Sequence, residues 1–205
     1  NKTSALKSAN INYEGAGLRI QSPELKIISY GIPAFNKKYH KTDLDRMFVK
    51  IPEDVNDPKS VEFFKMLDSI DNLMEDEEFK YKLFGKNAKL YKYNKLVKKP
   101  EENENNKTYP RFVKIKIYNE YNCEMVLTNV FIQNGDTRER VDGVNTLDDI
   151  SKYVRYNSNI KMLIQFMKLW ASKSKMANSD FKSYGLNIRL NQVICDKQKN
   201  YRETR

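Results

Sequence analysis

Alternation of apolar and polar side chains is the feature that most constrains how this chain can fold. In residues 111–118, Val113, Ile115 and Ile117 fall on every second position, and residues 186–194 repeat the pattern. Successive side chains of a β-strand point to opposite faces, so this period predicts half-buried strands. Together with apolar runs bounded by turn residues, it predicts strands over 18–20, 25–30, 46–51, 111–118, 125–133, 160–170 and 186–194.

Helices are predicted in one block in the first half of the chain. Asp57 followed by Pro58 is typical of a helix start, and apolar residues then recur at helical spacing up to about residue 74. A second short helix is expected over 77–84, ending at Gly85. Thr146 and Asp149 indicate a further capped helix running to about residue 154.

The order of these elements predicts a mainly β (α+β) fold. Five to eight antiparallel strands interrupted by one helical block suit a small closed or half-closed barrel, although the loop after Pro100 could instead divide two small domains. The expected organisation is an N-terminal arm (1–16), a core domain (17–195) with a helical insertion (57–100) and a polar loop (101–108), and a basic tail (196–205).

Charge is unevenly distributed along the chain, whose formal net charge is +10. The segment 80–99 carries eight lysines and no acidic residue, and residues 151–205 hold twelve basic residues against three acidic ones. Such segregation creates a directional field that fits nucleic acid, an acidic membrane surface or an acidic protein. The alternative is that the lysines only keep the protein in solution.

The sequence lacks the parts of several kinds of catalytic site. His40 is the only histidine, and Cys123 and Cys195 are the only cysteines, so Ser-His-Asp, Cys-His and four-ligand zinc sites are incomplete. No glycine-rich phosphate loop is present. We therefore expect a non-enzymatic protein without metal or cofactor, with buried thiols and no membrane-spanning segment. A metal-dependent nuclease that uses the abundant acids remains an alternative.

Aromatic rings are interleaved with cations on the outward faces of two predicted strands. In 46–51, Arg46, Phe48 and Lys50 share the face opposite Met47, Val49 and Ile51. In 111–118 the outward residues are Phe112, Lys114, Lys116 and Tyr118. Proteins that bind single-stranded nucleic acid need cations along the phosphates and flat side chains against the bases. An ordinary half-exposed strand can show the same residues, because aromatic residues favour strands.

Other positions extend this candidate surface. A loop with Lys37, Lys38, Tyr39 and His40 offers a ring between cations, and Trp170 fits either a core position or a stacking platform. The lysine-rich segment 80–99 fits either a strand of nucleic acid or a solvated flank. The predicted binding residues are Lys37, Lys38, Tyr39, His40, Arg46, Phe48, Lys50, Phe112, Lys114, Lys116, Tyr118, Arg155, Tyr156, Lys161, Trp170 and Arg189.

Short blocks of the sequence resemble one family. The blocks Tyr109–Lys116, Val130–Phe131, Tyr153–Ile160, Lys168–Ala171 and Tyr184–Leu186, with Gln21–Pro23, Tyr30–Pro33 and Leu83–Lys86 earlier in the chain, are similar to the single-stranded-DNA-binding proteins of large nucleocytoplasmic DNA viruses. The resemblance covers roughly residues 17–195. It implies an OB-like antiparallel β-barrel with added helices, no cofactor, and a role in coating unpaired DNA during viral replication, recombination or repair.

The function expected from residues and resemblance together is sequence-independent binding and protection of single-stranded DNA, with RNA left open. Self-association along the strand and replication proteins are further expected partners, and the expected location is the host cytoplasm (viral factory) or nucleus. The basic tail, with Lys197, Lys199, Arg202 and Arg205, departs from functionally similar bacterial proteins, which end in an acidic tail. The leading alternative is a structural or virion-packaging protein whose basic face binds a protein.

Overall fold

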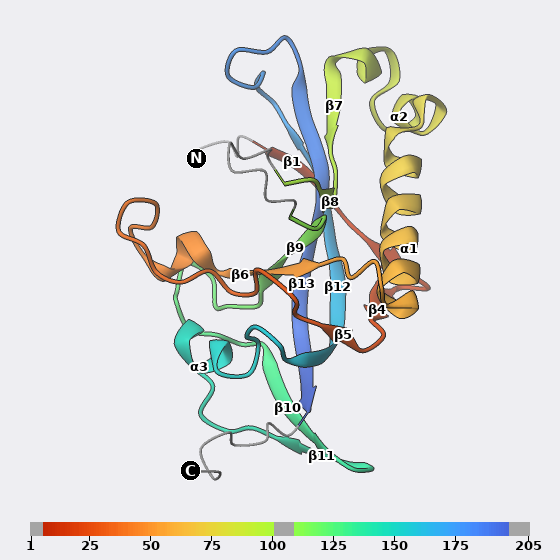
Figure 1. Cartoon of the computed structure of the whole chain (residues 1–205). Helices are drawn as coiled ribbons and strands as arrows, with labels where there is room; N and C mark the ends of the chain where they lie inside the picture. Colours follow the sequence, from red (N-terminus) through yellow and green to blue (C-terminus); the bar gives the residue numbers. More distant parts are fainter. Residues whose placement is uncertain (1–5, 101–108, 197–205) are drawn as a thin grey trace.

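The computed structural model describes residues 6–100 and 109–196 and has a mainly β fold with few helices (Figure 1). Within those ranges, eleven strands belong to one mixed sheet and β2 pairs separately with β3. The strands are β1 (Leu6–Asn10), β2 (Asn12–Tyr13), β3 (Ala16–Gly17), β4 (Arg19–Gln21), β5 (Leu25–Lys26), β6 (Phe48–Pro52), β7 (Tyr91–Asn94), β8 (Val97–Lys98), β9 (Phe112–Ile117), β10 (Asn129–Asn134), β11 (Thr137–Arg140), β12 (Asn159–Ser172) and β13 (Lys182–Asp196). The helices are α1 (Pro58–Glu75), α2 (Glu77–Phe84) and α3 (Leu147–Ser151), with 3₁₀ turns η1 (Asp43–Arg46) and η2 (Gly85–Leu90).

The long antiparallel hairpin of β12 and β13 forms the spine of the sheet (Figure 1). On β12, Ile160, Met162, Ile164 and Phe166 are buried at alternate positions, so the period that predicted this strand also fixes its inward face. The other edge of β12 pairs with β5, β4 and β1 in turn. Strand β9 also pairs with β6 and β8.

The expectation of purely antiparallel pairing is wrong for β13. Strands β7, β9 and β10 all run parallel to β13 along its second edge. Alternation of side chains has the same period in parallel and antiparallel strands, so the sequence carries no direct signal of strand direction. The direction follows from the long connections between these strands and β13.

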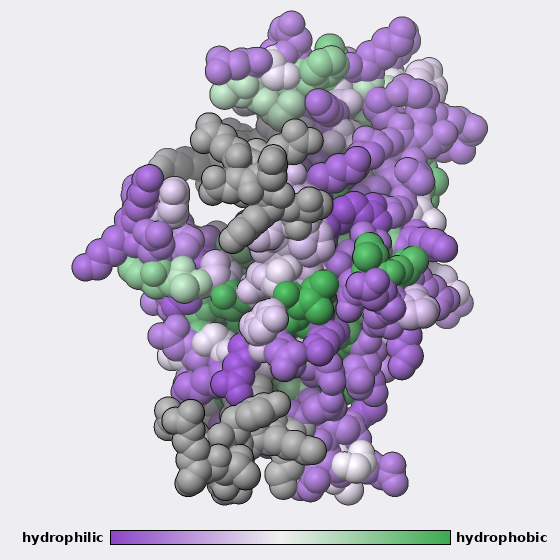
Figure 2. All heavy atoms as spheres, viewed as in Figure 1, coloured by the Kyte–Doolittle hydropathy of each residue, from purple (hydrophilic) through white to green (hydrophobic). Residues whose placement is uncertain are grey.

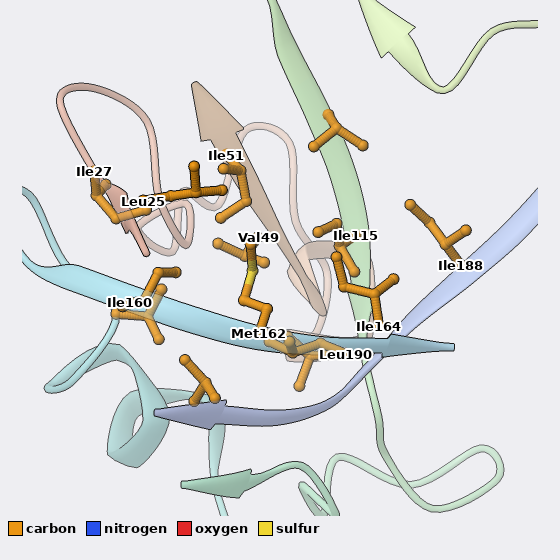
Figure 3. Packing of buried hydrophobic residues seen from close by; sticks show 14 of the residues in the cluster. Leu25, Ile27, Val49, Ile51, Ile115, Ile160, Met162, Ile164, Ile188 and Leu190 are labelled. Carbon is orange, nitrogen blue, oxygen red and sulfur yellow. The ribbon is translucent and has the colours of Figure 1, made fainter. Parts of the chain in front are cut away.

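Strands and helices converge on one large cluster of buried side chains (Figure 3). Leu147 and Ile150 of α3, and Phe64 and Leu67 of α1, belong to the same cluster and are almost fully buried. The core thus joins elements from the whole described chain. The cluster residues labelled in Figure 3 are Leu25, Ile27, Val49, Ile51, Ile115, Ile160, Met162, Ile164, Ile188 and Leu190.

The helices α1 and α2 occur where the sequence predicts them, and side-chain bonds hold α1 against the sheet. Asp57 caps α1 by accepting from the Lys59 N–H, and α2 ends at Gly85, whose φ of +57° disfavours other residues. The buried Asp71 carboxylate of α1 accepts hydrogen bonds from the Tyr93 hydroxyl and from the backbone N–H groups of Leu96 and Val97, at 2.8–3.0 Å. Burial and this carboxylate raise the pKa of Tyr93.

Several expected boundaries differ from the structure. The expected arm contains β1, which pairs with β12, and the expected helical insertion contains β7 and β8, which join the sheet. Only Leu25–Lys26 of the strand predicted over 25–30 is a strand, β10 begins at Asn129 instead of residue 125, and β11 was not predicted. Residues 1–5, the loop 101–108 and the tail from 197 lie outside the described residues. No helix in the described part of the chain has the length and apolar character needed to span a membrane.

Candidate nucleic-acid interface

The outward faces of β6 and β9 form one surface that carries most of the predicted rings and cations. The two strands are antiparallel neighbours, with Phe48 opposite Lys116 and Lys50 opposite Lys114. Their inward residues Val49, Ile51, Val113, Ile115 and Ile117 are fully buried. The alternation seen in the sequence therefore places Phe48, Lys50, Phe112, Lys114 and Lys116 together away from the core.

Lysine ammonium groups on this surface lie over aromatic rings. Lys114 Nζ is 3.6 Å from the centroid of the Phe48 ring, and Lys50 Nζ is 4.7 Å from that of Phe112. Tyr30 adds a third ring, 5.0 Å from Phe112 and 5.5 Å from Lys50 Nζ. The residue type and the strand period pointed to the first four residues, but Tyr30 comes from a segment without regular secondary structure, and its left-handed φ of +60° was not visible in the sequence.

The lysines of this surface repel one another. Lys50 and Lys114 are directly opposite on paired strands, an arrangement that disfavours folding. Lys98 on β8 is opposite Phe112. Burial lowers the pKa of Lys114, and the charge of Lys50 lowers it further. Burial also lowers the pKa of Lys98, against the opposing effect of the Asp71 carboxylate, and the charge of Lys114 adds to the lowering. Among the described residues, no carboxylate lies within ion-pair distance of Lys50, Lys98, Lys114 or Lys116.

A groove connects this surface to β12 and β13. One part, with a cavity volume of about 330 Å³, is bordered by Phe48, Lys98 and Lys114 and by Trp170 and Asn187 across from them. It adjoins a larger hollow of about 870 Å³. The two parts share Leu44, Met47, Lys116, Asn187 and Ile188 along their common border.

The larger hollow holds a second pairing of cation and ring. The Arg189 guanidinium lies 3.7 Å from the centroid of the Tyr118 ring, and Arg189 is the register partner of Lys116 on β9. Arg189 also donates to Gln165 Oε1 at 2.9 Å and to Asn191 Oδ1 at 3.1 Å. These bonds hold the guanidinium in place beside the groove without neutralising its charge.

Trp170 lines the groove and also packs on the sheet. It is the register partner of Gly185, where an added Cβ would be only 3.0 Å from the indole. The half-buried indole therefore covers a glycine of β13 on one side and borders the groove beside Phe48 and Lys114. Trp170 belongs to neither buried cluster, so the core position that the sequence left open is not its place, and its role as a stacking platform stays a prediction.

The structure separates the remaining predicted residues from the groove. Arg46 belongs to η1 instead of β6, and its buried guanidinium bonds Asp43 at 2.7 Å, Asp148 at 2.8 Å and the Pro33 carbonyl at 3.1 Å. The prediction that Arg46 points outward with Phe48 and Lys50 is wrong, because the capping box of Thr42 and Asp45 starts a 3₁₀ turn before the strand.

The loop that carries Lys37, Lys38, Tyr39 and His40 does not border the groove. Tyr39 is 68% exposed with Lys38 Nζ 5.3 Å from its ring, and His40 Nδ1 accepts from the Asn36 N–H at 3.1 Å. The predicted residues Arg155, Tyr156 and Lys161 lie at the opposite end of β12 from Trp170, about 30 Å away at the usual rise of a strand. Lys161 Nζ is 3.5 Å from Glu24 there.

Sequence reasoning missed several residues of the groove. Lys98 was part of the lysine-rich segment whose role was left open. Alternation places Asn187 on the outward face beside Arg189 without indicating a binding role, and Tyr121 had no distinguishing signal. Figure 2 shows that hydrophilic residues predominate on the side of the molecule in view, with hydrophobic residues gathered around its middle. Within residues 6–100 and 109–196, no three His, Cys, Asp or Glu side chains are grouped so as to hold a metal ion.

Comparison with known proteins gives a viral relative without a described activity. No protein-family model matches the chain. It is 25% identical over 224 residues to "Uncharacterized protein R505" of Acanthamoeba polyphaga mimivirus, an alignment that covers 93% of this chain and 55% of that protein. The chain therefore spans about half the length of this curated relative, to which it is distantly similar.

Proposed function

We propose that the protein binds single-stranded nucleic acid, preferentially DNA, in the groove between β6–β9 and β12–β13. The observation that carries the proposal is the set of lysines on this surface that have no carboxylate partner within residues 6–100 and 109–196, interleaved with the rings of Phe48, Phe112 and Tyr30. Cations follow a phosphate backbone, and exposed rings stack with unpaired bases of any sequence. The mutual repulsion of Lys50 and Lys114 would be relieved by a bound polyanion.

Stacking on Phe48 requires a base to displace Lys114 from its ring. An exposed cation–π contact contributes only about 0.5–1 kcal/mol, whereas stacking of a base contributes about 1–3 kcal/mol. The displaced ammonium can also pair with a phosphate, where a charge-assisted hydrogen bond is stronger than a neutral one. Exchange of the ring contact for base and phosphate contacts is therefore favourable.

An OB-like barrel around the buried cluster is the finer part of the fold proposal. Gly31 and Lys50 exchange two backbone hydrogen bonds of 3.0 Å, which bring the segment after β5 to β6, while β5 itself pairs with β12. These contacts support a circuit through β12, β13, β9, β6 and the β5 segment around the side chains of Figure 3. An experimental structure in which Gly31 and Lys50 are apart would contradict it.

The biological role that we propose is protection of unpaired DNA in viral replication, recombination or repair, in the host cytoplasm (viral factory) or nucleus. Its support is the resemblance of short sequence blocks to viral single-stranded-DNA-binding proteins and the distant similarity to a mimivirus protein. Replication proteins and further copies of the chain on the same strand are the proposed partners.

The proposal is tested by the affinity of the purified protein for fluorescent single-stranded DNA, single-stranded RNA and duplex of equal length. We expect tightest binding to single-stranded DNA. Equal affinity for duplex would favour a packaging protein with a merely basic face. Cleavage of the DNA when magnesium or manganese is added would instead favour a nuclease.

Substitution of the ring beside Lys114 gives a residue-level test. Phe48→Ala should weaken binding of single-stranded DNA by about 1–3 kcal/mol, because one stacking surface is lost. The matched control is Phe35→Ala, which removes an exposed ring outside the groove and should leave affinity unchanged. Equal losses in the two variants, with both proteins folded by circular dichroism, would contradict a role for the groove.

A further inference from the structure

The larger hollow of the groove differs chemically from the rest of the proposed interface. Beside the cations it presents amide side chains, of which Asn119, Asn122 and Asn187 border the same space as the rings of Tyr118 and Tyr121. Its volume of about 870 Å³ is within the range of small-ligand pockets. A surface that only follows phosphates needs no such amides.

Tyr121 is placed to cover a ligand in this hollow. Its side chain is 90% exposed, on a turn between β9 and β10 in which Asn122 has a left-handed φ of +54°. Asn119 donates to the carbonyls of Glu120 at 2.9 Å and Cys123 at 2.7 Å, so the turn is held by its own side chain. An exposed ring on a braced turn can stack with little loss of conformational freedom.

The amide groups give the hollow the means to distinguish bases. Asn187 on β13 is exposed and lines the groove, and its side chain has no hydrogen-bond partner among the described residues, so its donor and acceptor are both available to a ligand there. Proteins that recognise unpaired bases stack the base on an aromatic or guanidinium plane and bond its edge with side chains of this type. Tyr121 supplies a ring, Arg189 a guanidinium plane over Tyr118, and Asn187 the hydrogen-bonding group.

We propose that this hollow is a pocket for one unstacked nucleobase of the bound strand, and that it gives the protein a preference among bases. The inference rests on the proposed function and goes further, because strand binding through lysines and Phe48 alone would show no such pocket-dependent preference. The occupant is a nucleobase, since the pocket combines stacking planes with amide donors and acceptors.

The test measures the affinity of the full chain for dT, dC and dA homopolymers of equal length at one salt concentration. Intrinsic stiffness of the oligonucleotides also biases affinities, so the readout is the change in the affinity ratios between wild type and variant. Tyr121→Ala should weaken binding to the preferred homopolymer about 5- to 150-fold. Asn187→Ala should reduce the ratio of affinities between the best-bound and worst-bound homopolymers at least about 5-fold.

Matched controls separate the pocket from general effects. Tyr81→Ala on α2 and Asn72→Ala on α1 remove exposed side chains of the same kinds outside the groove and should change neither affinity nor ratio. If both pocket variants keep the affinity ratios of the wild type, or if Tyr121→Ala leaves affinity unchanged, the base pocket is overturned. Binding of the strand in the groove would still stand. No binding of wild type to any homopolymer would overturn the proposed function as well.

Discussion

At the scale of residues, Arg46 shows that a cation near the proposed interface can have a structural role. Its side chain is 6% exposed and bonds two carboxylates and a carbonyl, whereas Lys50, two positions into the next strand, has no carboxylate partner among the described residues. The bonds to Asp43 and Asp148 raise the pKa of Arg46 against the opposing effect of burial. Arg46 therefore joins η1 to the N-terminal end of α3 and is not available to a ligand.

Replacing Arg46 tests this assignment. Arg46→Ala should destabilise the fold by about 3 kcal/mol, at the lower end for a buried ion pair because Asp148 remains solvated. Urea unfolding followed by circular dichroism measures the loss. Arg19→Ala, an exposed arginine of β4, is the control and should stay within about 0.5 kcal/mol of wild type. A loss of DNA affinity without loss of stability would instead assign Arg46 to binding.

The sequence predicted the outward residues of β6 and β9 and failed at Arg46 for a local reason. The two-residue period holds from Phe48 to Lys50 but does not extend back through Thr42–Asp45, where a capping box of Thr42 and Asp45 starts a 3₁₀ turn. Trp170 and Asn187 meet Phe48, and Arg189 meets Lys116, only through the pairing of β12 and β13 with distant strands. The local period of a strand does not reveal which distant strands it will pair with, so the sequence could not predict these contacts.

At the scale of elements, the pairing of β6 with β9 places like charges opposite each other. Lys50 and Lys114 are register partners, and their proximity together with burial lowers the pKa of Lys114. Cross-strand pairs of opposite sign stabilise a sheet, and pairs of like sign destabilise it. The opposed lysines reduce the stability of the strand pair, which is consistent with a surface that binds an anion.

Removal of one charge should weaken binding with little change in the stability of the fold. Lys114→Met relieves the repulsion, worth about 0.2–1 kcal/mol, and also removes the cation–π contact with Phe48, worth about 0.5–1 kcal/mol. The free energy of unfolding should therefore stay within about 1 kcal/mol of wild type, while affinity for single-stranded DNA falls. Thermal unfolding and oligonucleotide titration measure the two effects, and Lys65→Met on α1 is the control. A variant that binds as tightly as wild type would contradict the proposed role of this charge.

The lowered pKa of Lys114 also has a consequence for pH dependence. The folded protein holds the Lys114 proton less tightly than the unfolded chain, so the unfolded state binds more protons as pH approaches the ordinary lysine pKa from below. In that alkaline window, Lys114 should make stability rise with pH. The contribution should be absent in Lys114→Met, and unfolding curves at increasing pH would reveal the difference.

At the scale of the whole molecule, the acidic segment 71–78 and the lysines of the groove lie on different parts of the fold. The acidic residues of the segment 71–78 belong to α1, α2 and their junction, which lie along one side of the sheet (Figure 1). Lys98, Lys114 and Lys116, which have no carboxylate partner among the described residues, line the groove between β6–β9 and β12–β13. Such separation directs a polyanion toward one face.

Mainly β character and the helical block were predictable from sequence periods, but the parallel pairing of β7, β9 and β10 with β13 was not.

The most direct test of the central claim is the salt dependence of single-stranded DNA binding in two double variants. Each lost phosphate contact should reduce the slope of log affinity against log salt by about 0.7, so Lys114→Gln with Lys116→Gln should reduce it by about 1.4. Lys59→Gln with Lys65→Gln, on the exposed side of α1, removes the same charge outside the groove and should leave the slope near that of wild type. Equal slopes for the two double variants, or a wild-type affinity indifferent to salt, would contradict phosphate binding in this groove.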